Sequence, residues 1–257
     1  MNDRDPDADQ RSLLVLDFTG RRAEAPISSL DLESAGFTVQ YLIQPPYPRA
    51  CTARDYAAEL LKRRDPSVPR PAGVLAYCMA APIAQEVLAM EAAEPGPGIP
   101  LILFDGEPVT VEAITSEYVL AAHKLGELLG LTAAASTPEV PVDPVRLRAS
   151  PEHALEDLRE GLVAIGRKGG GDEALADAEL IADFYLDWLA HLTAGYNADW
   201  PALPGRTVHL MSHGHTLPEP WPGGPVSATQ RFASDRDGLL LDPGVRAAVL
   251  SELRRGN

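Results

Sequence analysis

The chain has 257 residues, and its 22 Lys and Arg residues against 37 Asp and Glu residues give a net charge of −15. Such a length allows one large α/β domain with a buried core. The negative charge argues against nucleic acid and anionic membranes as partners, because both repel an acidic surface. With two cysteines and no apolar stretch near the roughly 18 residues that span a bilayer, we expect a reduced, cytoplasmic protein.

The first ten residues are polar and acidic, and we expect them to be disordered. Apolar runs that end at turns predict buried strands, and amphipathic segments between them predict helices. The predicted strands cover 13–20, 37–43, 73–77, 99–106, 206–212 and 228–233. The predicted helices cover 27–35, 52–62, 79–88, 111–131, 151–165, 172–196 and 243–254. Strands that alternate with helices favour a parallel sheet, in which ligands bind beyond the carboxyl ends of the strands.

A long stretch with only helical patterns interrupts this alternation. It runs from 111 to 200 and lies before the last two predicted strands. A helical insertion at this place is typical of a lid over an active site. We therefore predict an α/β core formed by residues 11–110 and 201–257, with residues 111–200 as a helical lid.

The stretch from Ala76 to Ala80 has the layout of a nucleophile elbow. An elbow holds a reactive residue in a strained turn between a strand and a helix, so small residues are needed two positions before and after it. Here the two alanines are the small residues, and Cys78 lies between them. Free cysteines are also common as small buried residues. From this stretch alone, Cys78 is either a nucleophile or a packing residue.

Other segments follow the elbow in a characteristic order. The run Leu103-Phe104-Asp105-Gly106-Glu107-Pro108 places an acid 27 residues beyond Cys78, and the long helix 184–192 and the strand 207–210 come later. In this order the segments resemble the thioesterases of nonribosomal peptide and polyketide assembly lines, both the terminal domains and the stand-alone type II enzymes. The resemblance covers residues 11–255. It implies an α/β-hydrolase fold, with a mostly parallel central sheet flanked by helices and a helical lid.

The resemblance also implies catalytic roles, with one departure. Cys78 replaces the family's nucleophilic serine, and Asp105 matches the acid of its catalytic triad. The family's histidine follows the last strand, whereas the corresponding segment here contains none and has Asp237 in its place. Cysteine partly tolerates this loss, because a thiol is already slightly ionised at neutral pH and a helix N-terminus lowers its pKa. Nearby charges on Asp105 and Asp237 would raise that pKa instead.

Two histidines are candidates for the missing base. His213 and His215 follow the predicted strand 206–212 at the same edge of the sheet, although a Pro- and Gly-rich loop also favours a simple surface position. For the oxyanion hole, the topology predicts the backbone N–H of Met79 and one near Phe18 or Thr19. No pattern in the sequence indicates a metal site or a cofactor.

Two functions remain open. In the first, Cys78 takes an acyl or peptidyl group from the phosphopantetheine arm of a carrier protein in nonribosomal peptide or polyketide biosynthesis. It then releases the group to water, an amine or an internal nucleophile. In the second, the chain is a degenerate, non-hydrolytic α/β-hydrolase that binds or rearranges a pathway intermediate or binds a carrier protein. The missing histidine favours the second function, and Cys78 with Asp105 favours the first.

Overall fold

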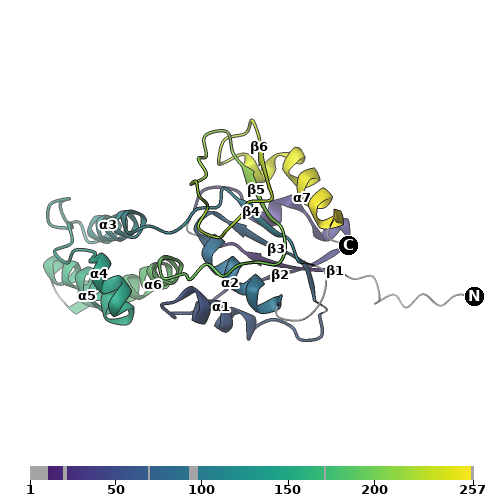
Figure 1. Cartoon of the computed structure of the whole chain (residues 1–257). Helices are drawn as coiled ribbons and strands as arrows, with labels where there is room; N and C mark the ends of the chain where they lie inside the picture. Colours follow the sequence, from purple (N-terminus) through teal and green to yellow (C-terminus); the bar gives the residue numbers. More distant parts are fainter. Residues whose placement is uncertain (1–10, 20–21, 69, 93–97, 171, 256–257) are drawn as a thin grey trace, which may run out of the picture. The chain divides into compact units, whose positions relative to one another are not determined.

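The computed structural model describes residues 11–19, 22–68, 70–92, 98–170 and 172–255 (Figure 1). The predicted disorder of residues 1–10 therefore lies outside the described residues. Contacts divide the chain into two compact units. The first, called the sheet unit, comprises Met1–Pro46, Ala57–Pro108 and Asp199–Asn257, and the second, called the helical unit, comprises Tyr47–Tyr56 and Val109–Ala198.

The sheet unit is built around six strands in the order β2-β1-β3-β4-β5-β6. All five neighbouring pairs are parallel, as the sequence predicts. The strands are β1 (Arg11–Leu16), β2 (Phe37–Tyr41), β3 (Pro71–Tyr77), β4 (Leu101–Phe104), β5 (Thr207–Met211) and β6 (Ala228–Arg231). Its helices are α2 (Ala81–Glu91) and α7 (Pro243–Arg255), while α1 (Ala53–Leu61) begins in the helical unit and ends in the sheet unit.

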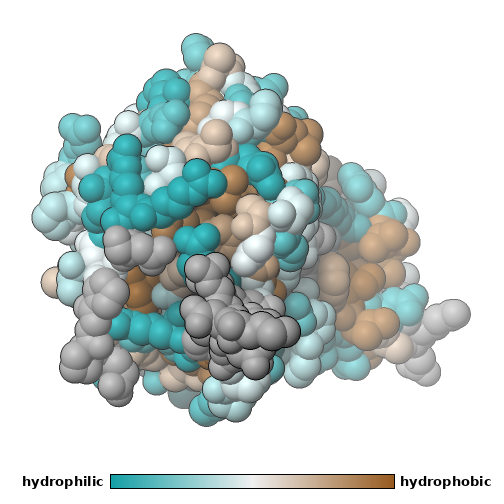
Figure 2. Space-filling model, turned by 90° about the vertical axis from the view of Figure 1, so that its right-hand side faces the viewer, coloured by the Kyte–Doolittle hydropathy of each residue, from teal (hydrophilic) through white to brown (hydrophobic). Residues whose placement is uncertain are grey.

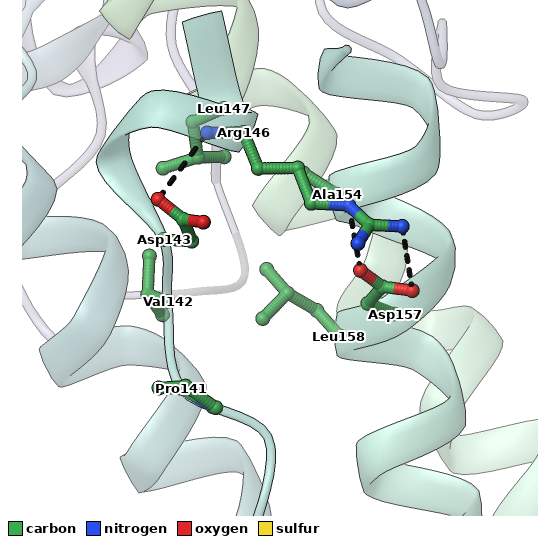
Figure 3. A pocket seen from close by; sticks show the side chains of 8 residues that line it. All are labelled: Pro141, Val142, Asp143, Arg146, Leu147, Ala154, Asp157 and Leu158. Atoms are coloured by element: carbon green, nitrogen blue, oxygen red, sulfur yellow. Dashed lines mark hydrogen bonds and ion pairs between the residues drawn. The ribbon is translucent and has the colours of Figure 1, made fainter. Parts of the chain in front are cut away.

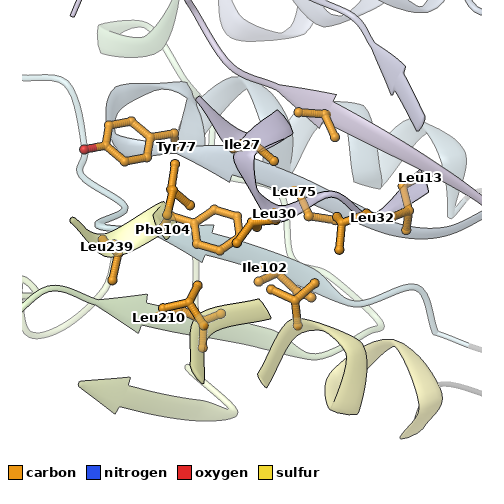
Figure 4. Close-up of a cluster of buried hydrophobic side chains, with 14 of the residues drawn as sticks. Leu13, Ile27, Leu30, Leu32, Leu75, Tyr77, Ile102, Phe104, Leu210 and Leu239 are labelled. Carbon is orange, nitrogen blue, oxygen red and sulfur yellow. The ribbon is translucent and has the colours of Figure 1, made fainter. Parts of the chain in front are cut away.

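Side chains that alternate along the strands form two apolar faces. One face carries Leu75, Phe104 and Leu210, which belong to the same buried cluster as Val249 and Leu253 of α7 (Figure 4). Helix α2 packs against β3 and β4, and Figure 1 shows α2 and α7 on opposite sides of the sheet. The continuous burial of the central strands follows from this double cover.

The register of the central strands brings their carboxyl ends to one level. Tyr77 at the end of β3 pairs with Phe104 of β4, and Phe104 pairs with Leu210 of β5. Cys78 and Asp105 are the next residues of their strands, so they leave the sheet at the same edge. This edge is where the sequence predicts the active site.

The helical unit contains α3 (Val111–Leu128), α4 (Pro144–Ala149), α5 (Pro151–Gly169) and α6 (Asp172–Tyr196). Within it, the side-chain amide of Asn197 donates to the carbonyls of Cys51 (3.1 Å) and Leu147 (2.9 Å). A cavity of about 20 Å³ lies beside α4 and α5, where Arg146 pairs with Asp157 (Figure 3). Such a volume holds about one water molecule, so this cavity is too small for a substrate.

Two local differences from the predicted elements have identifiable causes. The predicted helix 27–35 is instead two short 3₁₀ turns, Ile27–Leu30 and Glu33–Ala35, because Asp31 takes a left-handed conformation with φ 47° and ends the first turn. Helix α4 was not predicted. It begins where the Asp143 side chain accepts hydrogen bonds from the N–H groups of Val145 and Arg146.

The surface of the molecule is mixed in character. Figure 2 shows one face, on which hydrophilic residues lie between smaller groups of hydrophobic ones. Among the described residues, the large apolar side chains that are exposed are Leu120, Leu128, Val145, Leu180, Phe184 and Leu241. Among the described helices, none has the length and apolar character that crossing a bilayer requires.

Candidate functional site

Cys78 sits in a sharp turn between β3 and α2. Its φ is 52°, a left-handed conformation that is uncommon for residues other than glycine. Residues Cys78–Ala80 form a 3₁₀ turn that leads into α2, and Ala76 and Ala80 are both buried. The backbone N–H of Glu107 donates to the Cys78 carbonyl at 3.2 Å. This strand, sharp turn and helix, with a positive φ at the turn and small residues on both sides, match the backbone layout that a nucleophile elbow requires.

A guanidinium group contacts the sulfur directly. Arg236 Nη2 donates to Cys78 Sγ at 2.7 Å. The same guanidinium is held on its other sides, because Nη1 lies 3.2 Å from Glu107 Oε1 and Nε lies 3.1 Å from Glu24 Oε1. Nε also donates to the Tyr77 hydroxyl at 3.2 Å. Arg236 thus joins the loops after β1, β4 and β6 to the end of β3.

Asp105 is buried, and its carboxylate is hydrogen-bonded to Ser212. Its φ is 44°, and it is fully buried. Ser212 donates to both carboxylate oxygens, through its backbone N–H (2.8 Å) and its hydroxyl (2.7 Å). The carboxylate therefore links the carboxyl ends of β4 and β5.

His215 lies beside two carboxylates. Its Nδ1 is 3.5 Å from Glu107 Oε1 and 3.8 Å from Asp105 Oδ1. Its Nε2 is buried and has no hydrogen-bond partner among the described residues, so it does not bond Cys78 Sγ. The loop that carries His215 is fixed from the edge of the sheet, where Arg231 Nη1 donates to the carbonyls of Ser212 (2.9 Å), His213 (2.9 Å) and His215 (2.7 Å).

The remaining predicted site residues lie as follows. His213 is exposed, and its backbone N–H donates to the Ser234 carbonyl at 2.8 Å. Asp237 is exposed and has no hydrogen-bond or ion-pair partner in the part of the chain that the structure describes. The structure thus places Arg236, not Asp237, on the sulfur. Phe18 is buried and Thr19 is exposed.

An open cleft of about 550 Å³ lies at this edge of the sheet unit. It is lined by Asp105, Glu107, Ser212, His213, Gly214, His215, Thr216, Asp235 and Arg236. His215, whose Nε2 has no hydrogen-bond partner among the described residues, and Arg236, whose guanidinium contacts Cys78 Sγ, therefore line the same cleft. Among the described residues, no three His, Cys, Asp or Glu side chains are grouped so that they can hold a metal ion.

The loop after β1 covers Tyr77. Arg22 Nη2 pairs with both Asp17 oxygens, at 2.7 and 2.9 Å, and its guanidinium lies 3.6 Å from the centre of the Tyr77 ring. Asp17 Oδ2 also accepts from the Ile27 N–H at 2.7 Å. The ring of Tyr77 therefore has one cation stacked on it and a second, Arg236, at its hydroxyl.

The charge state of the thiol is set by opposing effects. Burial raises the pKa of Cys78 to about 12, and the Glu107 carboxylate adds to the rise. The charge of Arg236 and the N–H of Met79 act in the opposite direction. The lowering expected at a helix N-terminus is therefore outweighed, and the thiol is protonated at neutral pH. For Glu107 itself, a hydrogen bond from His215 and the charge of Arg236 lower the pKa of the carboxyl group despite burial.

Alkylation should report this protonated thiol. In a Cys51→Ala background, we expect the rate at which iodoacetamide modifies Cys78 to rise about tenfold per pH unit from about pH 7 to about pH 10, because only the thiolate reacts. Stopped-time labelling followed by intact mass measurement gives the rate. A plateau reached below about pH 8 would show that the thiol is ionised far more easily than its burial allows.

Sequence reasoning missed most of the residues around the sulfur. Glu107 and Tyr77 lie inside the motifs of the elbow and of the acid, yet neither motif assigns them a role. Arg236 adjoins the position of the missing histidine. A cation one residue from that position, opposite an elbow cysteine, is the signal that could have identified it.

Comparisons with known proteins bear on the fold. A scan against protein-family models and a search of curated proteins found no match. Among solved structures, a variant of a Pseudomonas aeruginosa protein assigned as an epoxide hydrolase has a TM-score of 0.51 and 12% identity, covering 96% of this chain and 90% of that one. A structure described as one of the epoxide hydrolases of the alpha/beta hydrolases superfamily, from metagenomes of hot environments, has a TM-score of 0.49 and 11% identity, covering 97% and 92%.

The chain has an α/β-hydrolase fold. This confirms the predicted fold class. The thioesterase domain of NocB also matches, with a TM-score of 0.49 and 15% identity over 96% of both chains. The likeness to the Pseudomonas aeruginosa structure, at 12% identity, establishes the fold alone, and the reaction has to be argued from the site.

Proposed function

We propose that this α/β-hydrolase is an acyl-transfer enzyme that acts on thioesters through Cys78. The observation that carries the proposal is the elbow: a cysteine with positive φ at the end of β3, whose sulfur meets N–H groups of Arg236 and Met79. A buried thiol in a packing role needs neither the strained turn nor a guanidinium. Both features are those of a nucleophile whose negative charge is stabilised as it forms.

The proposed reaction moves one proton and exchanges one thiol for another. His215 Nε2 takes the thiol proton, and Sγ attacks the carbonyl carbon of the substrate. The bond from that carbon to the departing sulfur breaks, and His215 returns the proton to the departing thiolate. Asp105 and Glu107 lie against Nδ1 of the same ring, which suits them to orient it and to stabilise its charged form.

The acyl group on Cys78 remains a thioester and keeps the energy of the substrate thioester. Release to water, to an amine or to an internal nucleophile is therefore open to this intermediate. The sequence resemblance supports an acyl or peptidyl group on a carrier protein of nonribosomal peptide or polyketide biosynthesis as the substrate. The role of residues 111–200 as a lid stays a prediction.

A second function is favoured by the charge state of the site. The pKa of Cys78 near 12 and the absence of a hydrogen bond between His215 Nε2 and Sγ disfavour a ready nucleophile. In this function the cleft binds an acyl intermediate or its carrier without forming a covalent bond. Such a protein would bind a thioester and leave it unchanged.

Mass spectrometry separates the two functions. We expect an acyl thioester of N-acetylcysteamine to add one acyl mass to the wild type and to Cys51→Ala, and none to Cys78→Ala. Cys51 is the matched control, because it is the other cysteine, is likewise buried and also has its pKa raised to about 12 by burial. An acyl mass retained by Cys78→Ala would contradict the assigned nucleophile. Binding of the thioester without any mass gain in the wild type would favour the second function.

A further inference from the structure

Arg236 is held in place before any substrate arrives. Its guanidinium is bonded to Glu24, Glu107 and Tyr77 within 3.1–3.2 Å, and these contacts leave Nη2 on the sulfur of Cys78. A guanidinium fixed by three partners needs no reorganisation when charge develops beside it. It stays charged at every pH at which the protein is folded, and so it cannot act as a base.

The contact with sulfur also determines what else Nη2 can reach. A carbonyl carbon attacked by Sγ becomes bonded to it, and the carbonyl oxygen is about 1.2 Å from that carbon. The N–H groups beside the sulfur therefore lie beside the oxygen on which negative charge collects. Arg236 lines the cleft, so this oxygen can approach it from the open side.

We propose that Arg236 is a further catalytic residue, which stabilises the negative charge first on the Cys78 sulfur and then on the carbonyl oxygen. The second part of this inference rests on the proposed acyl transfer. As the Sγ–C bond forms, the C=O electron pair moves to oxygen, and Nη2–H donates to the resulting oxyanion. As that pair returns to carbon, the bond to the departing sulfur breaks. Arg236 gives up no proton in either step.

Alkylation tests the charge at sulfur without any thioester. We expect Arg236→Gln to slow modification of Cys78 by iodoacetamide about tenfold, because the thiolate loses its cation. The rate of modification by negatively charged iodoacetate should fall still further, since the attraction of this reagent to the same cation also disappears. Arg236→Lys keeps the charge and should recover part of both rates. Arg254→Gln, an exposed arginine of α7, makes the same change in net charge and should react as the wild type does.

The rate of acyl transfer tests whether Arg236 stabilises the negative charge on the carbonyl oxygen. Arg236→Gln should lower kcat about 10²- to 10³-fold with little change in KM, as expected for a contact made in the transition state. Thermal melting of both variants shows whether they fold. Faster alkylation in Arg236→Gln would overturn the proposal, because the guanidinium would then be only a cover over the sulfur. Wild-type kcat in the folded variant would overturn the role at oxygen.

The two proposals fail in distinguishable ways. If the wild type never gains an acyl mass, the proposed acyl transfer is wrong, and the alkylation rates still decide whether Arg236 stabilises charge at sulfur. If Arg236→Gln gains an acyl mass as readily as the wild type does, the acyl transfer stands and the role of Arg236 is wrong.

Discussion

Replacing Asp105 by alanine should destabilise the protein by about 3 kcal/mol, whereas Asp105→Asn should cost less than about 1 kcal/mol. The alanine leaves two buried donors of Ser212, its N–H and its hydroxyl, without their acceptor. Asparagine keeps both bonds, because its carbonyl oxygen accepts from the N–H while its amide donates to the hydroxyl oxygen. Asparagine also tolerates the positive φ of this position better than most residues.

Denaturant unfolding of the sheet unit within the full chain measures these changes. Asp237→Ala is the matched control, since it removes a carboxylate that is exposed and has no partner among the described residues. It should change the free energy of unfolding by less than about 0.5 kcal/mol. Equal losses for the alanine and asparagine variants at position 105 would mean that the negative charge, and not the pair of hydrogen bonds, stabilises this strand end. Because Asp105→Asn should remain folded, its rate of acyl transfer also shows how much the reaction depends on the negative charge at position 105.

His215→Asn should lower acyl transfer to Cys78 by about 10²- to 10⁴-fold, the usual contribution of a general base. The asparagine amide can replace the contact that Nδ1 makes with Glu107, but it supplies no group that accepts a proton at neutral pH. The loop should keep its conformation, because Arg231 holds it through backbone carbonyls. The loss should therefore be one of rate rather than of folding.

The rate of appearance of the acylated protein measures this effect. His213→Asn is the control from the same loop, since His213 is exposed and, among the described residues, its side chain forms no ion pair with the carboxylates that flank His215. We expect it to react at close to the wild-type rate. Equal rates in the two variants would remove His215 from the reaction. A loss of rate in His213→Asn alone would show that His213, and not His215, is the base.

The strands and the place of the site were predictable because their signals are local. Apolar runs that end at Tyr77, Phe104 and Met211 mark buried parallel strands, and the parallel arrangement alone brings the residues after them to one edge. The sequence alone therefore places Cys78 and Asp105 at that edge. The short 3₁₀ turns around Asp31 could not, since they depend on one backbone angle that the helical pattern does not reveal.

The charges around the sulfur were not predictable for a different reason. Arg236 lies 158 residues from Cys78 and 129 residues from Glu107 along the chain, and it sits in a loop without periodicity. The resemblance to thioesterases identified this loop but assigned its neighbour, Asp237, to the position of the histidine. Adjacent residues in a turn point in different directions, so an error of one position exchanges a cation at the sulfur for an exposed carboxylate.

The hydrogen bonds of Arg231 imply that the conformation of the His215 loop depends on a residue outside the loop. The carbonyls of Ser212, His213 and His215 accept from one guanidinium carried by the edge strand β6. The side chains of these three residues take no part in the bonds. Loop residues other than Ser212 and His215, whose side chains contact Asp105 and Glu107, can thus vary during evolution or in a designed library without loss of these three bonds, provided that the arginine is kept. For protein engineering, the transferable module is the loop together with Arg231, since either part grafted alone would lose the shape that presents the imidazole.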